Sequence, residues 1–301
     1  MEARRHRLCA LASLVAVAAT ACRHQPADAL VSYAELTAAP VAPATARIAY
    51  GPGARQFGDL RLPNGHGPFP IVVLVHGGCW QAGYGLDYVA PAAAALTRLG
   101  VATWSIEYRR LGDPGGGWPG TFEDVARATS YVTQLAERFP LDPRHVVLAG
   151  HSAGGQLALW VAQRERRAIG DAPALPAAIT IRGVIGLAGI TDLRAYSADP
   201  GSCNLSVAEL LDGMPAERPD RYAAASPIER LPLGVPSRMV HGASDPIVSV
   251  DQSRTFAERA KSAGDDAGLV VVPGAGHFDL VAPSSAAWPA VVDAVRGLLP
   301  R

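Results

Sequence analysis

Hydrophobic residues from about residue 47 onward alternate between short continuous runs and helix-like spacing, with turn residues between them. The run 71–75 (IVVLV) is typical of a strand buried on both faces. Between Thr121 and Phe139 apolar residues recur at helical spacing until Pro140 ends the pattern. The predicted strands are 47–50, 57–62, 71–75, 101–108, 146–149, 179–187, 238–240 and 269–272. The predicted helices are 88–99, 121–139, 153–164, 253–263 and 288–299.

This alternation predicts an α/β fold with a mostly parallel central sheet and helices on both faces. The predicted domain covers 46–301. Residues from about 191 to 233 break the rhythm with several prolines and two short helical pieces, 207–211 and 220–225. We expect this stretch to be a small insertion over the carboxyl edge of the sheet, where it covers the active site.

The first residues form an export signal. A basic start that contains Arg4, Arg5 and Arg7 precedes an apolar run, 8–21, which is too short to span a bilayer. Small residues before Cys22 favour a bacterial lipoprotein signal, in which Cys22 becomes lipidated. The alternative is plain secretion with an unmodified cysteine. In either case 1–21 is removed. The Ala/Pro-rich stretch 22–45 is predicted to be a tether.

Composition excludes several other classes of protein. The chain has 301 residues, 27 basic and 27 acidic side chains, and 49% hydrophobic residues. The hydrophobic share argues against disorder, and the charge balance argues against nucleic-acid binding. Lys261 is the one lysine, and it lies in a polar helical stretch, so Schiff-base and Ser–Lys chemistry are disfavoured. No metal-binding, phosphate-binding or dinucleotide-binding motif is present, and no cofactor is expected.

The strongest chemical motif is Gly-His-Ser-Ala-Gly around Ser152, between the strand 146–149 and the helix 153–164. A sharp strand-to-helix turn of this kind exposes the serine hydroxyl as a nucleophile. Asp245 follows the strand 238–240, and His277 follows the strand 269–272. The chain order Ser152, Asp245, His277 matches the catalytic triad of α/β-hydrolases. Other histidines are weaker candidates for the base, and Asp279 is a weaker candidate for the acid because it lies next to the histidine turn.

A second motif, His-Gly-Gly-Cys-Trp at residues 76–80, follows the strand 71–75. Its glycines let backbone N–H groups point into the cleft. The N–H groups of Gly77, Gly78 and Ala153 are predicted to form the oxyanion hole. His76 is expected to be a structural hydrogen-bonding group. Trp80, and Trp118 from a Gly-rich loop, are candidate pocket residues, with plain core packing as the alternative for Trp80.

Four segments together resemble a known family: HGGCW, GHSAGG, HGASDPIV and GAGHFDL. They look like α/β-hydrolases of the carboxylesterase and kynurenine-formamidase-like group, and the resemblance covers about residues 55–299. In that group the HGGxW segment forms the oxyanion loop. The stretch Glu107-Tyr108-Arg109 also resembles the family, and a structural role is expected there.

The implied activity is hydrolysis of a small-molecule ester by a serine hydrolase through an acyl-enzyme intermediate. An arylformamidase or other amide hydrolase would use the same residues, and a non-catalytic binding module is the alternative of another class. Membrane contact is expected only through a lipid on Cys22, and the oligomeric state stays open. Cys79 and Cys203 either form a disulfide that holds the insertion over the active site or remain unpaired.

Overall fold

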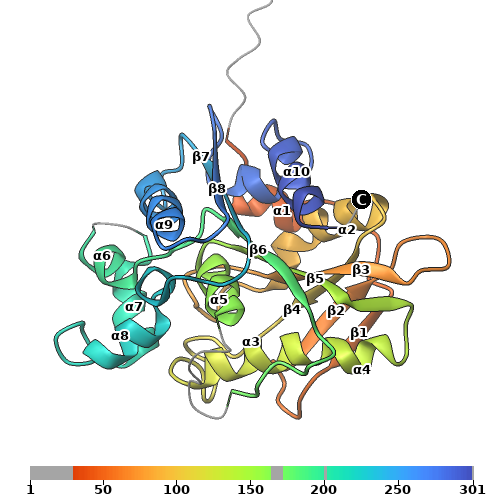
Figure 1. Ribbon diagram of the computed structural model, residues 1–301, viewed down its shortest axis with the longest axis horizontal. Coiled ribbons are helices and arrows are strands. Elements are labelled where there is room, and N and C mark those ends of the chain that lie inside the picture. Colours follow the sequence, from red (N-terminus) through yellow and green to blue (C-terminus); the bar gives the residue numbers. More distant parts are fainter. Residues whose placement is uncertain (1–29, 164–171, 200–201, 300–301) are drawn as a thin grey trace, which may run out of the picture.

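The computed structural model describes residues 30–163, 172–199 and 202–299. The predicted signal peptide and Cys22 lie outside the described residues. The described strands form one eight-stranded sheet in the order β1-β2-β4-β3-β5-β6-β7-β8 (Figure 1). Their bounds are β1 Ala46–Ala49, β2 Phe57–Arg61, β3 Phe69–Val75, β4 Ala102–Ile106, β5 Leu141–His151, β6 Ile181–Leu187, β7 Ser237–Gly242 and β8 Ala267–Val272.

The sheet is parallel from β4 to β8, and β1 and β2 add an antiparallel edge. The carboxyl ends of the parallel strands therefore meet at one edge, where loops from different strands can share a site. All eight predicted strands are confirmed, with ends that differ by a few residues. The fold class predicted from the hydrophobic pattern is correct.

Helices cover both faces of the sheet: α3, α4 and α5 lie on one side, and α1, α2 and α10 on the other (Figure 1). The predicted helix 121–139 is divided into α3 and α4. The bounds are α1 Tyr33–Ala38, α2 Ala90–Arg98, α3 Gly120–Ser130, α4 Val132–Ala136, α5 Ala153–Ala162, α6 Leu193–Ala198, α7 Asn204–Leu211, α8 Pro219–Ala225, α9 Val250–Ser262 and α10 Trp288–Leu298. None of the helices in the described ranges meets the length and hydropathy needed to cross a membrane.

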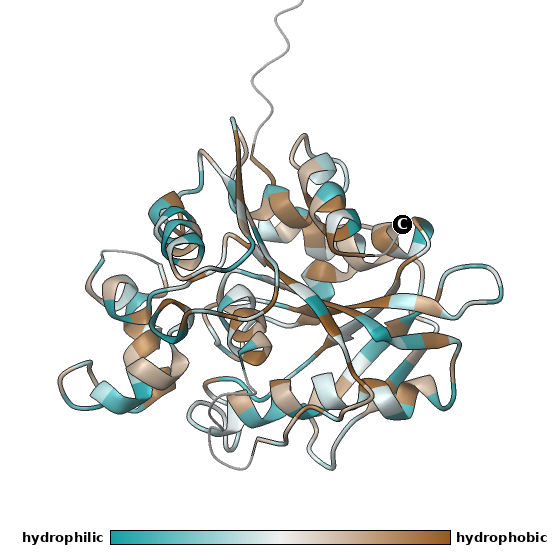
Figure 2. Ribbon diagram, in the orientation of Figure 1, coloured by the Kyte–Doolittle hydropathy of each residue, from teal (hydrophilic) through white to brown (hydrophobic). Residues whose placement is uncertain are grey.

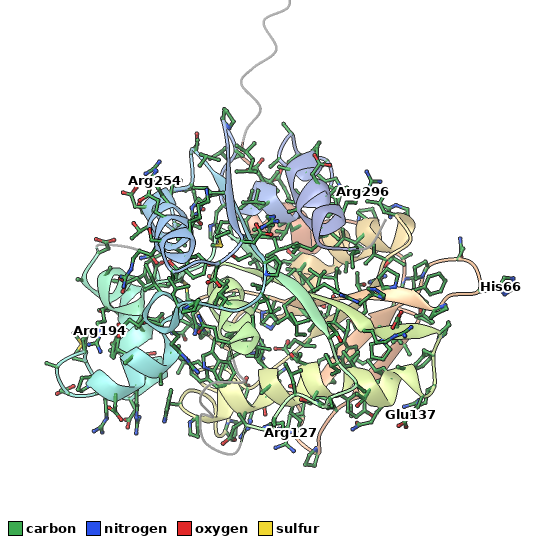
Figure 3. The ribbon with its side chains drawn as sticks, in the orientation of Figure 1. His66, Arg127, Glu137, Arg194, Arg254 and Arg296 are labelled. Carbon is green, nitrogen blue, oxygen red and sulfur yellow. A yellow bond between two sulfur atoms is a disulfide. The ribbon has the colours of Figure 1, made fainter. Side chains whose placement is uncertain are left out.

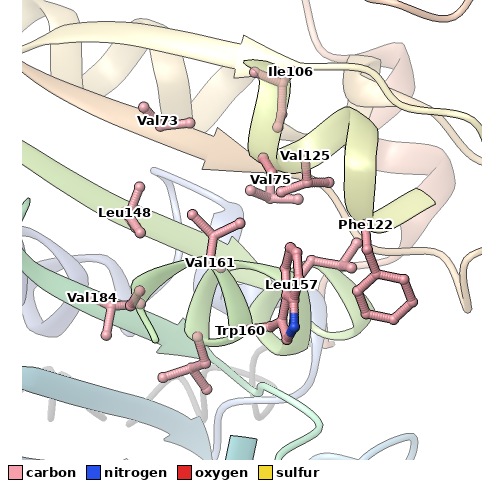
Figure 4. Packing of buried hydrophobic residues seen from close by; sticks show 14 of the residues in the cluster. Val73, Val75, Ile106, Phe122, Val125, Leu148, Leu157, Trp160, Val161 and Val184 are labelled. Atoms are coloured by element: carbon pink, nitrogen blue, oxygen red, sulfur yellow. The ribbon is translucent and has the colours of Figure 1, made fainter. Parts of the chain in front are cut away.

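The central strands are buried on both sides, as their β-branched runs predict. Figure 4 shows the packing of α5 on the sheet, with Val161 toward Leu148 of β5 and with Leu157 and Trp160 toward Phe122 of α3. Hydrophobic residues concentrate toward the sheet and polar residues toward the outside (Figure 2). The labelled charged side chains Arg127, Glu137, Arg254 and Arg296 lie at the periphery in Figure 3.

The stretch predicted to be a tether is instead folded against the domain from residue 30 onward. Helix α1 begins after Ser32, whose hydroxyl accepts a hydrogen bond from the backbone N–H of Glu35, while the Glu35 carboxylate accepts from the backbone N–H of Ser32. This capping box satisfies N–H groups at the helix end, and Leu36 is buried beneath it. The prediction overlooked the Ser-x-x-Glu signal because alanine and proline dominate the composition around it.

Candidate active site

Ser152 lies at the turn between β5 and α5 in a strained backbone conformation, with φ 57° and ψ −123°. A positive φ is costly for a residue with a side chain and persists only where the surroundings enforce it. The motif glycines near Ser152, Gly150 and Gly154, have no room for a side chain. A Cβ on Gly150 would overlap the carbonyl oxygen of Gly154, and a Cβ on Gly154 would overlap the carbonyl oxygen of Val75.

Asp245 and His277 are brought together from the loops after β7 and β8. Oδ2 of Asp245 lies 2.7 Å from Nδ1 of His277. The other carboxylate oxygen, Oδ1, accepts hydrogen bonds from the backbone N–H groups of Ile247 and Val248 at 2.8 and 3.0 Å. The carboxylate is thereby oriented by the loop that carries it.

The electrostatics of this pair favour an ionised acid. Burial acts to raise the pKa of Asp245, but hydrogen bonds from His241 and His277 and the charge of His277 outweigh it. The pKa of Asp245 is therefore held well below its usual value. Because an ionised carboxylate only accepts, Nδ1 of His277 carries the proton and Nε2 is left as the basic nitrogen. None of the described residues forms a hydrogen bond with that Nε2. Ser152 and His277 line the same pocket.

A buried chain of hydrogen bonds connects the oxyanion loop to the histidine loop. The backbone N–H of Gly77 donates to the hydroxyl of Tyr88 at 2.6 Å, and this hydroxyl lies 2.9 Å from Nδ1 of His151. Nε2 of His151 lies 3.0 Å from the carbonyl oxygen of His277. A carbonyl only accepts, so His151 donates from Nε2 and accepts at Nδ1 from Tyr88. Burial, followed by the nearby His277 charge, lowers the pKa of His151 well below its usual value, which matches a neutral ring.

This chain corrects one of the predicted oxyanion donors. Gly77 N–H already donates to Tyr88, so it is not available to a substrate. Within the described ranges, no acceptor is bound to the backbone N–H of Gly78 or of Ala153. Gly77 is needed for a different reason: a Cβ there would lie 2.5 Å from the carbonyl oxygen of His151 and 2.9 Å from Cβ of Ser152. The glycine lets the loop approach the serine.

His76 is structural, as expected. Its Nδ1 lies 2.8 Å from the carbonyl oxygen of Gly77, and its Nε2 lies 2.9 Å from the carboxylate of Glu107. Both ring nitrogens therefore lie within hydrogen-bond distance of an oxygen atom. Burial acts to raise the pKa of Glu107, but the His76 charge and hydrogen bond, with Arg110, hold it below its usual value. The ion pair anchors the oxyanion loop to the segment after β4. In that segment Arg109 also pairs with a buried carboxylate on α3.

The structure does not place the two predicted tryptophans at the pocket. Trp80 is buried in the core and donates from Nε1 to the side chain of Gln156 at 3.1 Å. Trp118 packs edge-on against Phe122, with its ring centre 5.3 Å away, and does not line the pocket either. Cys79 and Trp80 both have positive φ, and the Trp80 side chain is fully buried.

The pocket beside Ser152 has a volume of about 250 Å³, and four of its lining residues are tyrosine or phenylalanine. Its rings come from Tyr33, Tyr84, Tyr88 and Phe278. The sequence analysis assigned no role to these four residues. Phe278 follows His277 directly and could have been identified on that ground. Tyr33 could not, since it precedes the sheet and reaches the site only through tertiary packing.

Cys79 and Cys203 form a disulfide, with Cα atoms 5.1 Å apart. It connects the oxyanion loop to the insertion just before α7. Both cysteines, together with Ser202, line the pocket. The insertion thus contributes a wall of the site, and this wall is joined covalently to the loop that carries Gly78, a predicted oxyanion donor.

Asp279, the weaker candidate for the acid, has a different role. Its Oδ2 accepts hydrogen bonds from the backbone N–H groups of Gly276 at 3.0 Å and Val31 at 3.3 Å. Asp279 thereby holds the turn before His277 and the segment before α1. In the described part of the chain no group of three or more histidine, cysteine or acidic side chains is arranged to hold a metal ion.

Comparison with known proteins identifies the family. The sequence model of the BD-FAE family matches residues 59–260. The esterase LipC of Mycobacterium tuberculosis is 29% identical over 249 residues, which cover 78% of this chain and 60% of LipC. A probable isoprenylcysteine alpha-carbonyl methylesterase of Oryza sativa is 27% identical over 241 residues, covering 77% of this chain and 58% of that protein. The chain therefore spans about 60% of the length of these relatives.

Solved structures agree on the fold. A truncated carbohydrate esterase from gut microbiota superposes with a TM-score of 0.72 at 22% identity, covering 84% of this chain and 94% of that one. Esterase 2 of Thermogutta terrifontis, phosphonylated by sarin, superposes with a TM-score of 0.71 at 21% identity, covering 87% and 99%. At this level of identity the likeness establishes the α/β-hydrolase fold.

Proposed function

Because the chain belongs to the BD-FAE family of α/β-hydrolase esterases, we propose that it hydrolyses carboxylic esters through an acyl-enzyme formed on Ser152. One observation carries the proposal. A serine in a strained strand-to-helix turn shares a pocket with His277, whose Nδ1 lies 2.7 Å from the buried Asp245 carboxylate. In a Ser-His-Asp triad, a histidine oriented by a buried carboxylate takes the proton of the serine hydroxyl, and these three residues are our candidates for those roles.

The first half of the reaction forms the acyl-enzyme. Nε2 of His277 takes the hydroxyl proton of Ser152 while Oγ attacks the ester carbonyl carbon. The N–H groups of Gly78 and Ala153 donate to the resulting oxyanion, and Asp245 stabilises the protonated imidazole. The tetrahedral intermediate collapses as the C–O bond to the alcohol breaks. His277 then delivers its proton to the departing alkoxide oxygen.

The second half releases the acid. A water molecule gives a proton to Nε2 of His277, and its oxygen attacks the acyl carbon. Collapse of the second tetrahedral intermediate breaks the bond to Oγ of Ser152, which recovers the proton from His277. The products are an alcohol and a carboxylic acid, and no cofactor takes part in these steps.

A fluorescent fluorophosphonate tests the proposal, together with turnover of p-nitrophenyl acetate. We expect the wild type to be labelled and Ser152→Ala to lose the label and about 10⁴–10⁶-fold in kcat, with the fold retained. Ser202→Ala is the matched control, because Ser202 lines the same pocket, and it should keep the label. Labelling of Ser152→Ala would show that another group is the nucleophile. Turnover of an aryl formamide in preference to the ester would replace esterase by amide hydrolase.

We also propose that the protein is exported and held at a membrane by a lipid on Cys22. The support is the signal-like pattern of the first residues and the small residues before the cysteine. Leu30, the first described residue, follows Cys22 by about eight residues, a reach of at most about 28 Å. Mass spectrometry of the mature N-terminus tests this proposal: a diacylglyceryl adduct on Cys22 supports it, and an unmodified Cys22 refutes it.

A further inference from the structure

The segment before the sheet contributes a side chain to the candidate site. Tyr33, in α1, lines the pocket that contains Ser152 and His277. Its ring centre lies 5.1 Å from that of Tyr84, 5.4 Å from that of Tyr88 and 6.0 Å from that of Phe278. These separations are those of packed aromatic pairs. Tyr33 is thus one wall of an aromatic enclosure next to the nucleophile.

Several contacts hold this wall in place. The backbone N–H of Val31 donates to Asp279, the residue that also holds the turn before His277. On the other side of Tyr33, Leu36 is buried against α2 and its neighbours. The capping box at Ser32 begins the helix between these two anchors. The position of the Tyr33 ring is therefore coupled to the loop that carries the proposed base.

This wall comes from the part of the chain that precedes the family match. The match to the BD-FAE family begins at residue 59, whereas α1 ends at Ala38. The motifs that identify the family carry no information about Tyr33. A residue from outside those motifs that borders the pocket can change which substrates fit without changing the chemistry at Ser152.

The enclosed volume limits what can bind. A cavity of about 150 Å³ accommodates benzene, whereas pockets for larger ligands start near about 300 Å³. The pocket here, at about 250 Å³, lies between the two. Its exposed lining is mainly apolar and includes the four tyrosine and phenylalanine rings, Ile247 and the disulfide. A single ring or a short aliphatic chain matches both its size and its apolar character.

We propose that Tyr33 is a specificity-determining residue that restricts the group bound beside Ser152 to a single ring or a short chain. The inference rests on the proposed ester hydrolysis. Removing the ring in Tyr33→Ala opens the enclosure on the side of α1. A larger substrate group then gains apolar contacts that the tyrosine excludes in the wild type.

The test measures kcat/KM on two series of esters. The first series is p-nitrophenyl acetate, butyrate, hexanoate and octanoate, and the second is phenyl acetate and 1-naphthyl acetate. In Tyr33→Ala we expect the ratio of long to short acyl chain, or of naphthyl to phenyl, to rise at least about tenfold, the discrimination that about one methylene gives in an apolar pocket. Tyr33→Trp, with a larger ring, should shift the same ratio the opposite way.

Two control variants separate size from disturbance of the segment. Tyr33→Phe keeps the ring and should keep the wild-type ratios. Thr37→Ala alters an exposed residue on the same helix and should also keep them. If Thr37→Ala shifts the ratios as Tyr33→Ala does, the effect comes from the helix as a whole and the inference about the ring is wrong.

The outcome also distinguishes this inference from the proposed function. If Ser152→Ala is inactive and Tyr33→Ala retains both wild-type ratios, the role of Tyr33 is refuted and the esterase mechanism stands. If Ser152→Ala hydrolyses the esters as the wild type does, the proposed mechanism itself fails. A rise of either ratio in Tyr33→Ala, together with an inactive Ser152→Ala, supports both, whereas a fall of the ratios refutes the role of Tyr33.

Discussion

Removing one oxygen atom, in Tyr88→Phe, should weaken both the fold and the site. The hydroxyl of Tyr88 is buried, accepts from Gly77 N–H at 2.6 Å and donates to Nδ1 of His151 at 2.9 Å. Phenylalanine fills the same space but leaves two buried polar groups without partners. An unsatisfied buried group costs about 1–3 kcal/mol. We therefore expect the free energy of unfolding to fall by about 2–6 kcal/mol.

Activity should fall as well, because the two groups that lose their partner belong to the site. Gly77 precedes Gly78, the proposed oxyanion donor, and the ring of His151 forms a hydrogen bond with the backbone carbonyl of His277. We expect kcat for p-nitrophenyl acetate to fall about tenfold or more, since small misplacements of catalytic groups are costly. Urea unfolding and steady-state kinetics on the same preparation measure both effects.

Tyr50→Phe is the matched control. The Tyr50 side chain is also buried, but its hydroxyl donates to a single group, the backbone carbonyl of Glu107, at 2.7 Å. Tyr50→Phe should lower the free energy of unfolding by roughly 1–2 kcal/mol, about half the loss expected for Tyr88→Phe or less. It should leave kcat within about twofold of the wild type. If both variants lose equal stability and neither changes kcat, the chain of hydrogen bonds through Tyr88 does not position the site, and the reasoning is refuted.

Three further predictions concern other parts of the site. Asp245→Asn should lower kcat about 10⁴-fold. Because the pKa of Asp245 is depressed in the fold, the ionised carboxylate stabilises the folded protein at neutral pH. This stabilisation is lost as the pH falls below about 4. The Tm difference from wild type should therefore shrink only in that acid range, and a difference that shrinks near pH 6 would contradict this. Replacing Cys79 and Cys203 by serine should cost about 2–5 kcal/mol, since the bond closes a separation of 124 residues; reductant should reproduce this loss in the wild type and leave the double variant unchanged. Gly154→Ala should lower Tm and abolish fluorophosphonate labelling, because the added Cβ overlaps a backbone carbonyl of β3. Gly297→Ala is the control: its added Cβ meets open space, so the free energy of unfolding should rise by up to about 1 kcal/mol. Equal effects of the two substitutions would refute the steric argument.

Much of the fold could be read from local pattern. Buried parallel strands require continuous apolar runs, and 71–75 shows one without ambiguity. The turn at Ser152 could also be predicted from local pattern. Only glycine fits at positions 150 and 154, so the glycines of the motif mark the tight turn and the serine marks the candidate nucleophile. The pairing of Asp245 with His277 followed from their places after neighbouring parallel strands, whose ends meet at one edge.

Failures of prediction occurred where a residue's role depends on what it contacts. Positions 77 and 78 are both glycine, yet only the backbone N–H of Gly77 donates a hydrogen bond to the hydroxyl of Tyr88. Trp80 ends the loop segment 76–80, but its side chain lies in the core, and both Trp80 and the preceding Cys79 have positive φ. No periodicity or spacing in the sequence predicts either of these two contacts.

The sequence by itself determined the strands and the serine turn, because each depends on neighbours within a few positions, and it shows the chain order of the three candidate catalytic residues. Tertiary structure alone decided which walls enclose the site. Tyr33 and Phe278 are separated by most of the chain, yet their rings lie 6.0 Å apart. Such contacts arise when distant segments bury their apolar surfaces together, and that free energy depends on the whole fold rather than on any local stretch.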